Sequence, residues 1–471
     1  MRRALLLILS GNALTSILLL VRSLVVARLL TLEDFGIAAT FAIVIAIIEM
    51  ASGLGIQQLI VQDKKGNDPE LQAGLQGFNF MRGVGAGLVL FALAAPIAIA
   101  MAVEEAIWAY QLLALVPILK GLEHLDIHRL NRDMDFGPLI FSRVAPAVLS
   151  VAAIFPLCAV FNDYSAMLYS ILLHTVLTVI SSHLVANRRF RMRFRRAIMG
   201  KSLKFGWPLL INNVLLFLAF QADKVLVGRF LGMETLALFS MGVTLTLTPN
   251  LVSNQSIQQF FLPQLSENRD RQLEYEHLAA ATIQASLASG LLLMLGMIII
   301  ADPLVRLLLG DKYLALIPLL PWLGIWQAMR AFKIGNSVIA LSLAQTSNAM
   351  WANAVRATFI PLALLILIQG GGVLEVIWIA ILAEFAAFST SLRLLLTRTR
   401  LDPLSLNVPL LLSLGTLAAA GPMYVTFTLY YDNTLLGYFM ITALVIASLA
   451  SMREFGQYVA LKFLNPAPRA A

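Results

Sequence analysis

Five basic side chains lie inside segments that otherwise have the composition of membrane-spanning helices: Arg22, Lys224, Arg330, Lys333 and Arg356. A charge held at bilayer depth costs from about 3 to more than about 10 kcal/mol. Arg330 and Lys333 stand three residues apart and therefore share one face of a helix. Because desolvated Arg and Lys side chains are strong partners for phosphate groups, these residues predict a cationic cavity that binds an anion within the membrane.

Acidic residues in the same segments offer a second interpretation, in which the charges pair with one another. These residues are Glu49, Asp223 and Glu384. Glu49 lies at a depth similar to that of Arg22, and Glu384 could meet Arg356, since charges in membranes are often paired. Arg330 and Lys333 have no acidic residue in their own segment, which makes them the strongest candidates for an anion site. The three carboxylates are also candidates for ion coupling.

The rest of the chain has the composition of an integral membrane protein. Of its 471 residues, 59% are hydrophobic and 13% charged, and the mean hydropathy is +0.83. A spanning helix needs roughly 20 apolar residues, and the apolar runs are too uniform for the alternating strands of a membrane barrel. We therefore predict an all-α membrane protein with about fourteen transmembrane helices. Their ranges are 5–30, 36–61, 77–101, 106–123, 138–160, 164–186, 206–231, 235–261, 278–301, 314–341, 347–369, 373–396, 405–430 and 435–460.

The net charge of +8 arises from Lys and Arg residues that gather in alternate loops. The most basic of these loops runs from Asn187 to Lys204. Because Lys and Arg mark cytoplasmic loops in membrane proteins, both termini are predicted to be cytoplasmic. The charge is thus a topology signal and does not indicate nucleic-acid binding. Cys158 is the only cysteine, which excludes a disulfide framework or a thiol-based metal site.

Two short matches at one constant offset indicate an internal repeat. Arg28-Leu29-Leu30 followed by Glu33 matches Arg229-Phe230-Leu231 followed by Glu234, and Ile56-Gln57-Gln58 matches Ile257-Gln258-Gln259. The offset covers an even number of predicted helices, so the copies have the same orientation, as in transporters built from parallel repeats. We predict an N-terminal six-helix lobe at 1–190, a basic cytoplasmic linker at 191–204, a C-terminal six-helix lobe at 205–396, and two additional helices at 405–460.

The sequence offers no constellation that would catalyse a reaction. It has no glycine-rich loop for ATP phosphates, no cluster of metal ligands, and no nucleophile beside a base. We therefore expect a protein that is not an enzyme and that uses no cofactor. Energy for transport would come from an ion gradient or from the gradient of the substrate.

Several motifs resemble those of the Wzx-type polysaccharide flippases, which are members of the multidrug/oligosaccharidyl-lipid/polysaccharide exporter superfamily. The resemblance rests on Ala27 to Gly36 (ARLLTLEDFG) and Gly53-Leu54-Gly55-Ile56 in the first lobe, and on Asp223 to Gly232 (DKVLVGRFLG) and Phe261 to Ser266 (FLPQLS) in the second. It extends over essentially the whole chain. The Thr-Leu-Glu-Asp-Phe-Gly form is most similar to the colanic-acid exporter branch.

The resemblance implies a flippase that moves a polyprenyl-pyrophosphate-linked oligosaccharide across the bacterial inner membrane by alternating access. It implies that a central cationic cavity receives the pyrophosphate, and the five basic residues above fit that role by position and chemistry. Implied partners are membrane lipids and glycan-assembly proteins such as a polysaccharide polymerase. Three alternatives stay open: a lipid II-type flippase, a multidrug or cation exporter of the same superfamily, and a membrane scaffold for glycan synthesis.

Overall fold

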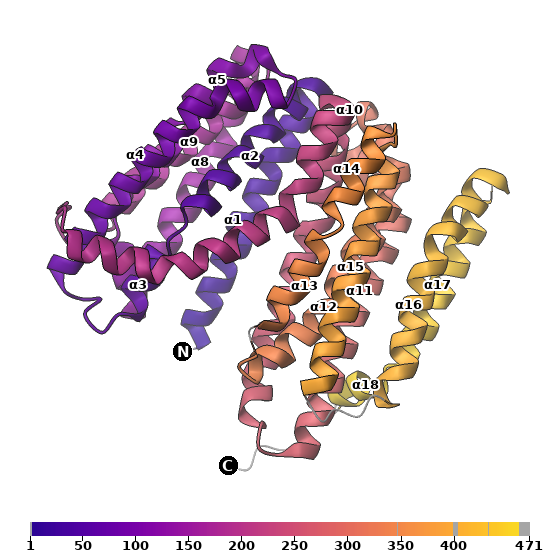
Figure 1. Ribbon diagram of the computed structural model, residues 1–471. Helices are drawn as coiled ribbons and strands as arrows, with labels where there is room; N and C mark the ends of the chain where they lie inside the picture. The colour runs from indigo at the N-terminus through magenta and orange to yellow at the C-terminus, as the bar shows by residue number, and fades with distance from the viewer. Residues whose placement is uncertain (1, 346, 399–403, 432, 461–471) are drawn as a thin grey trace. The chain divides into compact units, whose positions relative to one another are not determined.

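The structure is a computed structural model that describes residues 2–345, 347–398, 404–431 and 433–460. Every regular element in these ranges is a helix (Figure 1), which confirms the prediction of an all-α protein. The chain forms two compact units, Met1–Ser240 and Met241–Ala471, called unit 1 and unit 2 below. This division falls at a different place from the predicted linker 191–204. The repeat and its lobe boundaries remain a prediction from the sequence.

Unit 1 is a bundle in which α8 packs between α1 and α9, while α4 packs against α5 and α6. Figure 1 shows α8 and α9 running side by side. Its elements are α1 (Arg2–Leu29), α2 (Leu32–Ser52), α3 (Ile56–Gln62), α4 (Pro69–Ala100), the 3-10 helix η1 (Glu104–Ala106), α5 (Ile107–Leu113), α6 (Leu115–Gly121), α7 (Asp126–Arg132), α8 (Gly137–Phe161), α9 (Ser165–Leu184) and the first part of α10 (Arg196–Glu267).

A glycine interrupts α10 near the end of unit 1. Gly232 has a φ of +84° and a ψ of 171°, so two helices meet there at a kink. Side chains other than glycine rarely adopt such a backbone conformation. The next residue, Met233, places its backbone directly against Gly36 at the start of α2, where any Cβ would collide with it. Two glycines of the motifs noted above therefore shape the same part of unit 1.

Unit 2 is built around α12, which packs between α11 and α15. The helices α16 and α17 pair with each other and contact α11. The elements of this unit are α11 (Gln272–Leu308), the 3-10 helix η2 (Asp311–Leu319), α12 (Leu320–Ser342), α13 (Ser347–Ala357), α14 (Ile360–Ile368), α15 (Val373–Arg398), α16 (Leu404–Val425), the π-helix η3 (Thr426–Tyr430), α17 (Thr434–Ala450) and α18 (Arg453–Val459), together with the second part of α10.

Some predicted spans have different limits in the structure. The segment predicted at 36–61 is two helices, because α2 ends at Ser52 and Gly55 takes a φ of +63° before α3 begins. The segment predicted at 435–460 is also two helices, since α17 and α18 meet at a bend of 73°. The segment predicted at 106–123 is divided among η1, α5 and α6.

Within the described residues, nine helices are long and apolar enough to cross a membrane, or up to eleven if each bent pair forms one span. The protein is therefore a multi-pass membrane protein. The number of about fourteen spans stays a prediction.

Candidate anion-binding site

Three of the predicted basic residues converge on one carboxylate in unit 2. Arg330 Nε lies 2.6 Å from Glu384 Oε1, and Arg356 NH1 lies 3.1 Å from the same oxygen. Lys333 Nζ lies 3.2 Å from Glu384 Oε2. The Glu384 side chain has no exposed surface, and that of Arg330 is 8% exposed. These four residues are called the cation cluster below.

Helix packing explains how residues far apart in the sequence form the cation cluster. Arg330 and Lys333 lie three residues apart on α12, which brings both to one face of that helix. The helix α15 packs against both α12 and α13, so its Glu384 lies within reach of all three cations. Arg330 also places its guanidinium 4.5 Å from the ring centre of Trp326, a cation–π contact one turn away on α12.

The cation cluster carries more positive than negative charge. Its three cations and one carboxylate give the four side chains a net charge of +2. Burial makes such an excess expensive, because mutual attraction repays the loss of hydration only where charges are matched. The geometry is suited to an anion with several oxygens, since guanidinium groups offer paired donors and an ammonium offers a point charge.

Of the ion pairs suggested by the sequence, the pair between Glu384 and Arg356 is present in the structure. Arg330 and Lys333, however, are not without an acidic partner, because Glu384 approaches them from α15. Their own helix contains no acid, so only the packing of α12 on α15 reveals this contact.

Unit 1 holds its charges around an open cavity of about 420 Å³. Arg82, Lys120, Arg143, Glu49 and Glu123 all line it. The Glu49 carboxylate forms an ion pair with Lys120, and both side chains are more than a third exposed. Glu49 therefore pairs with Lys120 and not with Arg22, the partner suggested by the sequence, because α2 packs against α6 as well as against α1.

Arg22 occupies a different environment on α1. Its Nε and NH1 atoms are buried without a hydrogen-bond partner among the described residues. A buried guanidinium with unused donors can accept an anionic ligand, since leaving such donors unpaired carries a desolvation cost.

Two cations of the unit 1 cavity were missed by the sequence analysis although the same rule would have found them. Arg82 lies inside α4 and Arg143 inside α8, both of them candidate spans. Arg82 donates from NH1 to the Ser52 carbonyl at 2.9 Å and from NH2 to Asn79 Oδ1 at 3.0 Å. Neutral oxygens therefore hold its guanidinium in place without cancelling its charge.

The remaining predicted residues, Asp223 and Lys224, are half-buried on α10 in unit 1. A single cavity formed by Arg22, Lys224 and the cation cluster stays a prediction. Among the described residues, no group of three or more His, Cys, Asp or Glu side chains could hold a metal ion.

Comparison with known proteins places this chain in a family. The model of the family described as "Polysaccharide biosynthesis protein" matches residues 25–318. The chain belongs to this family. It is 23% identical over 333 residues to the teichuronic acid biosynthesis protein TuaB of Bacillus subtilis, a match that covers 69% of this chain and 68% of TuaB. The assignment to the colanic-acid branch remains a prediction.

Solved structures identify the fold. The chain superposes on an inward closed conformation of the lipid II flippase MurJ with a TM-score of 0.70 and 14% identity, covering 97% of this chain and 99% of that structure. It superposes on an inward-facing multidrug resistance MATE family transporter of the MOP superfamily with a TM-score of 0.69 and 15% identity, covering 82% and 94%. The protein therefore has the fold shared by these transporters.

Proposed function

We propose that this protein flips a polyprenyl-pyrophosphate-linked oligosaccharide across the bacterial inner membrane for surface polysaccharide assembly. The observation that carries the proposal is the cation cluster, in which the buried Arg330 and Arg356 and the partly buried Lys333 all contact the carboxylate of Glu384. Membership of the polysaccharide biosynthesis family supplies the class of substrate. The protein would act without catalysis or a cofactor, with both termini in the cytoplasm.

In this proposal the pyrophosphate of the substrate competes with Glu384 for the cations. Oxygen atoms of the pyrophosphate would accept hydrogen bonds from the guanidinium groups of Arg330 and Arg356 and from the ammonium of Lys333. Glu384 keeps the three cations in position when no substrate is bound. The sugars and the lipid lie outside the cluster, and alternating access would expose the headgroup to each side of the membrane in turn.

A lipid II-type flippase is the second candidate, since its substrate also carries a pyrophosphate. The fold shared with MurJ is compatible with this role, but the family match favours a polysaccharide precursor. A multidrug or cation exporter would need acidic charge where this cluster carries a net positive charge. A scaffold role predicts that neutralising the cluster affects abundance and never transport alone.

A complementation experiment tests the proposed function. A strain that lacks this protein would express Arg330→Ala, Lys333→Ala or the double variant, and surface polysaccharide would be scored beside membrane abundance. Arg306→Ala is the matched control, because Arg306 pairs with Asp302 at an exposed position of the same unit. We expect normal abundance of the single variants with at least about a tenfold loss of polysaccharide, the size of one charged hydrogen bond. Normal polysaccharide in the double variant would contradict the proposal.

A further inference from the structure

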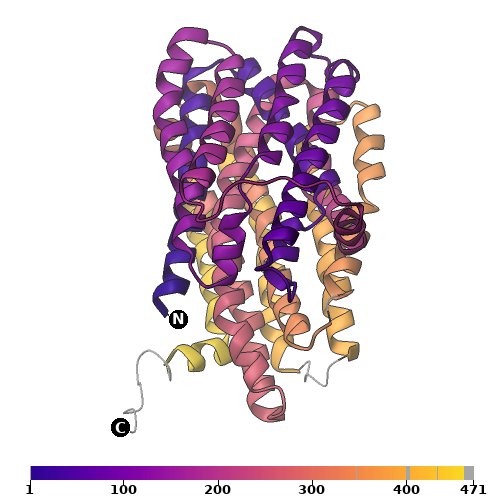
Figure 2. The same ribbon diagram turned by 90° about the vertical axis from the view of Figure 1, so that its left-hand side faces the viewer.

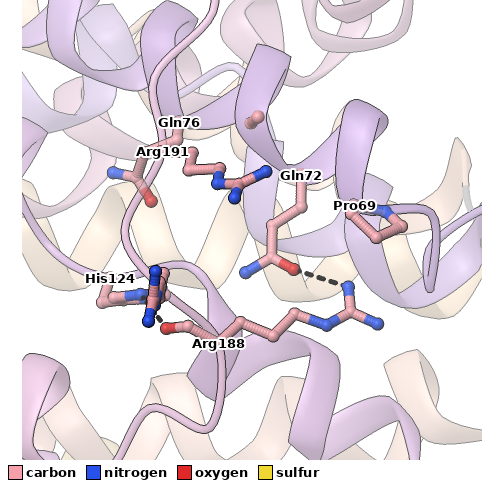
Figure 3. A pocket seen from close by; sticks show the side chains of 8 residues that line it. Pro69, Gln72, Gln76, His124, Arg188 and Arg191 are labelled. Atoms are coloured by element: carbon pink, nitrogen blue, oxygen red, sulfur yellow. Dashed lines mark hydrogen bonds between the residues drawn. The ribbon is translucent and has the colours of Figure 1, made fainter.

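A second group of arginines lies outside the membrane spans, on the segment 187–195 that joins α9 to α10. Figure 2 shows this segment crossing the face of unit 1 as an extended trace. In the sequence, its charges have the pattern of a cytoplasmic linker and indicate the topology. The structure shows that the segment is fixed to unit 1 and forms one wall of a pocket (Figure 3).

Hydrogen bonds fix this segment at both ends. The backbone nitrogens of Asn187 and Arg188 donate to Asp126 Oδ2 at 2.9 and 3.2 Å. At the other end, the backbone nitrogen of Arg193 donates to the carbonyl of Ala73 on α4 at 2.9 Å. Gly77, one turn further along α4, has no room for a Cβ because the backbone of Arg193 lies against it. The arginines between these anchors are therefore held in place before any ligand arrives.

The arginines of this segment fall into two kinds. Arg193 and Arg195 both pair with Glu70. Arg189 and Arg191 are exposed and form no ion pair with any residue that the structure describes. The segment thus contains both neutralised and unneutralised arginines within a few residues of each other.

Arg188 differs from both kinds because the hydrogen-bond partners of its guanidinium are neutral. Its NH1 donates to Gln72 Oε1 at 2.9 Å and its NH2 to the carbonyl of Asn67 at 3.0 Å. These bonds fix the direction of the guanidinium without removing its charge. Its carbonyl lies 3.0 Å from His124 Nε2, which ties the backbone to the pocket wall.

The three unneutralised arginines line one pocket of about 250 Å³. The lining consists of Pro69, Gln72, Ala73, Gln76, His124, Arg188, Arg189 and Arg191, and it contains no carboxylate. Figure 3 shows the Arg191 side chain reaching between Gln76 and Gln72, with Arg188 running beneath Gln72. Clustered guanidinium groups that no carboxylate neutralises are suited to binding a phosphate group.

The position of the pocket indicates that the phosphate belongs to a membrane lipid. Pro69 begins α4 and the arginines follow soon after the end of α9, and both helices are candidate membrane spans. The pocket therefore lies where spans leave the membrane, at the level of lipid headgroups. Phe194, on the same segment, is 59% exposed, as expected of an aromatic residue at a membrane interface. Basic pockets between spans at a cytoplasmic surface bind anionic lipid headgroups.

We propose that this pocket binds the phosphate of an anionic phospholipid from the adjoining leaflet. The inference is independent of the proposed transport function, since no residue of the cation cluster takes part. We expect the bound lipid to stabilise the contact between the segment 187–195 and α4, and thereby the start of α10.

The test compares lipid binding by two double variants of the purified full-length protein. Arg189→Gln/Arg191→Gln removes two unpaired arginines, and Arg193→Gln/Arg195→Gln removes two that are paired with Glu70, so both lose the same charge. Native mass spectrometry would measure binding of phosphatidylglycerol, with phosphatidylcholine as the neutral lipid. We expect the first variant to bind phosphatidylglycerol about 30-fold more weakly than the wild type, the effect of two basic residues at an anionic surface. The second variant should bind it nearly as the wild type does.

Two further measurements separate the possible outcomes. Arg189→Lys/Arg191→Lys keeps the charge and should retain most of the binding, which would rule out a folding defect as the cause. Equal losses in both double variants would show a general charge effect and overturn the proposal, as would no loss in the first. If glycerol 3-phosphate protects the protein from thermal unfolding as well as phosphatidylglycerol does, the site binds soluble phosphates and the lipid assignment is wrong.

Discussion

In unit 2, three cations surround one carboxylate that has no exposed surface, whereas in unit 1 cations and acids line an open cavity of about 420 Å³. Salt screens exposed charges strongly and buried charges weakly. Buried charges also hold each other in fixed geometry, because moving one apart leaves the others without hydration or partner. One protein thus combines a buried charged cluster with an open charged cavity.

The largest expected difference between the two regions is the loss of stability when the acidic residue of each is removed. Glu384→Ala leaves three cations without their shared carboxylate, and we expect it to lower the free energy of unfolding by about 3–5 kcal/mol. Glu49→Ala removes an acid whose side chain is 44% exposed, and its cost should not exceed about 1 kcal/mol. Thermal unfolding in detergent and membrane abundance would measure both. Similar losses in the two variants would show that the regions do not differ in burial as described.

Substrate affinity measured at low and high ionic strength tests the same difference between the buried cation cluster and the open cavity. Lys120→Gln and Lys333→Gln each remove one positive charge, the first from the open cavity and the second from the cation cluster. Between low salt and about 0.5 M salt, we expect the effect of Lys120→Gln on affinity to shrink several-fold, because the screening length falls well below about 10 Å. The effect of Lys333→Gln should persist. Binding of the lipid-linked substrate would be titrated at both salt concentrations, and an equal response would remove the distinction.

The smallest expected effect lies outside the membrane, where Lys201 pairs with Asp63. The hydrogen bond from Lys201 holds the pKa of Asp63 below its usual range. A lowered pKa stabilises the folded state above the unfolded pKa, and this contribution disappears as pH falls through the folded pKa. Lys201→Gln should therefore cost up to about 1 kcal/mol at pH 7, and this cost should begin to shrink near the unfolded pKa of about 3.9 and disappear only below the lowered folded pKa. Thermal unfolding across this pH range measures the change, and a cost independent of pH would contradict the assignment.

The sequence was sufficient for the helical fold and for the location of most buried cations. Runs of apolar residues identify helices directly, because a spanning helix must be apolar along its length. The contacts of Arg330 and Lys333 could not be predicted, since their partner Glu384 lies on another helix and only packing sets which helices face each other. Matching depths suggested Arg22 as the partner of Glu49, but depth does not specify neighbours, and Lys120 on α6 takes that place.

The basic segment after α9 shows a different limit of sequence reasoning. The positive-inside rule explains why arginines gather there, and that explanation is complete without any structure in the segment. The rule does not predict which of these arginines form an ion pair with a carboxylate. Arg193 pairs with Glu70, while Arg191 lines a pocket, and the difference depends on how the backbone is fixed to α4.

The central claim is that the cation cluster binds the pyrophosphate in competition with Glu384. Its most direct test is equilibrium binding of a polyprenyl pyrophosphate by purified Glu384→Gln and Arg356→Gln variants, each checked for folding by its unfolding temperature. The two substitutions change the charge of the cluster in opposite directions. The account predicts tighter binding by Glu384→Gln and weaker binding by Arg356→Gln, with about tenfold or more between them. Weaker binding by both folded variants would contradict it, because Glu384 would then support the ligand or the structure and not compete with the ligand.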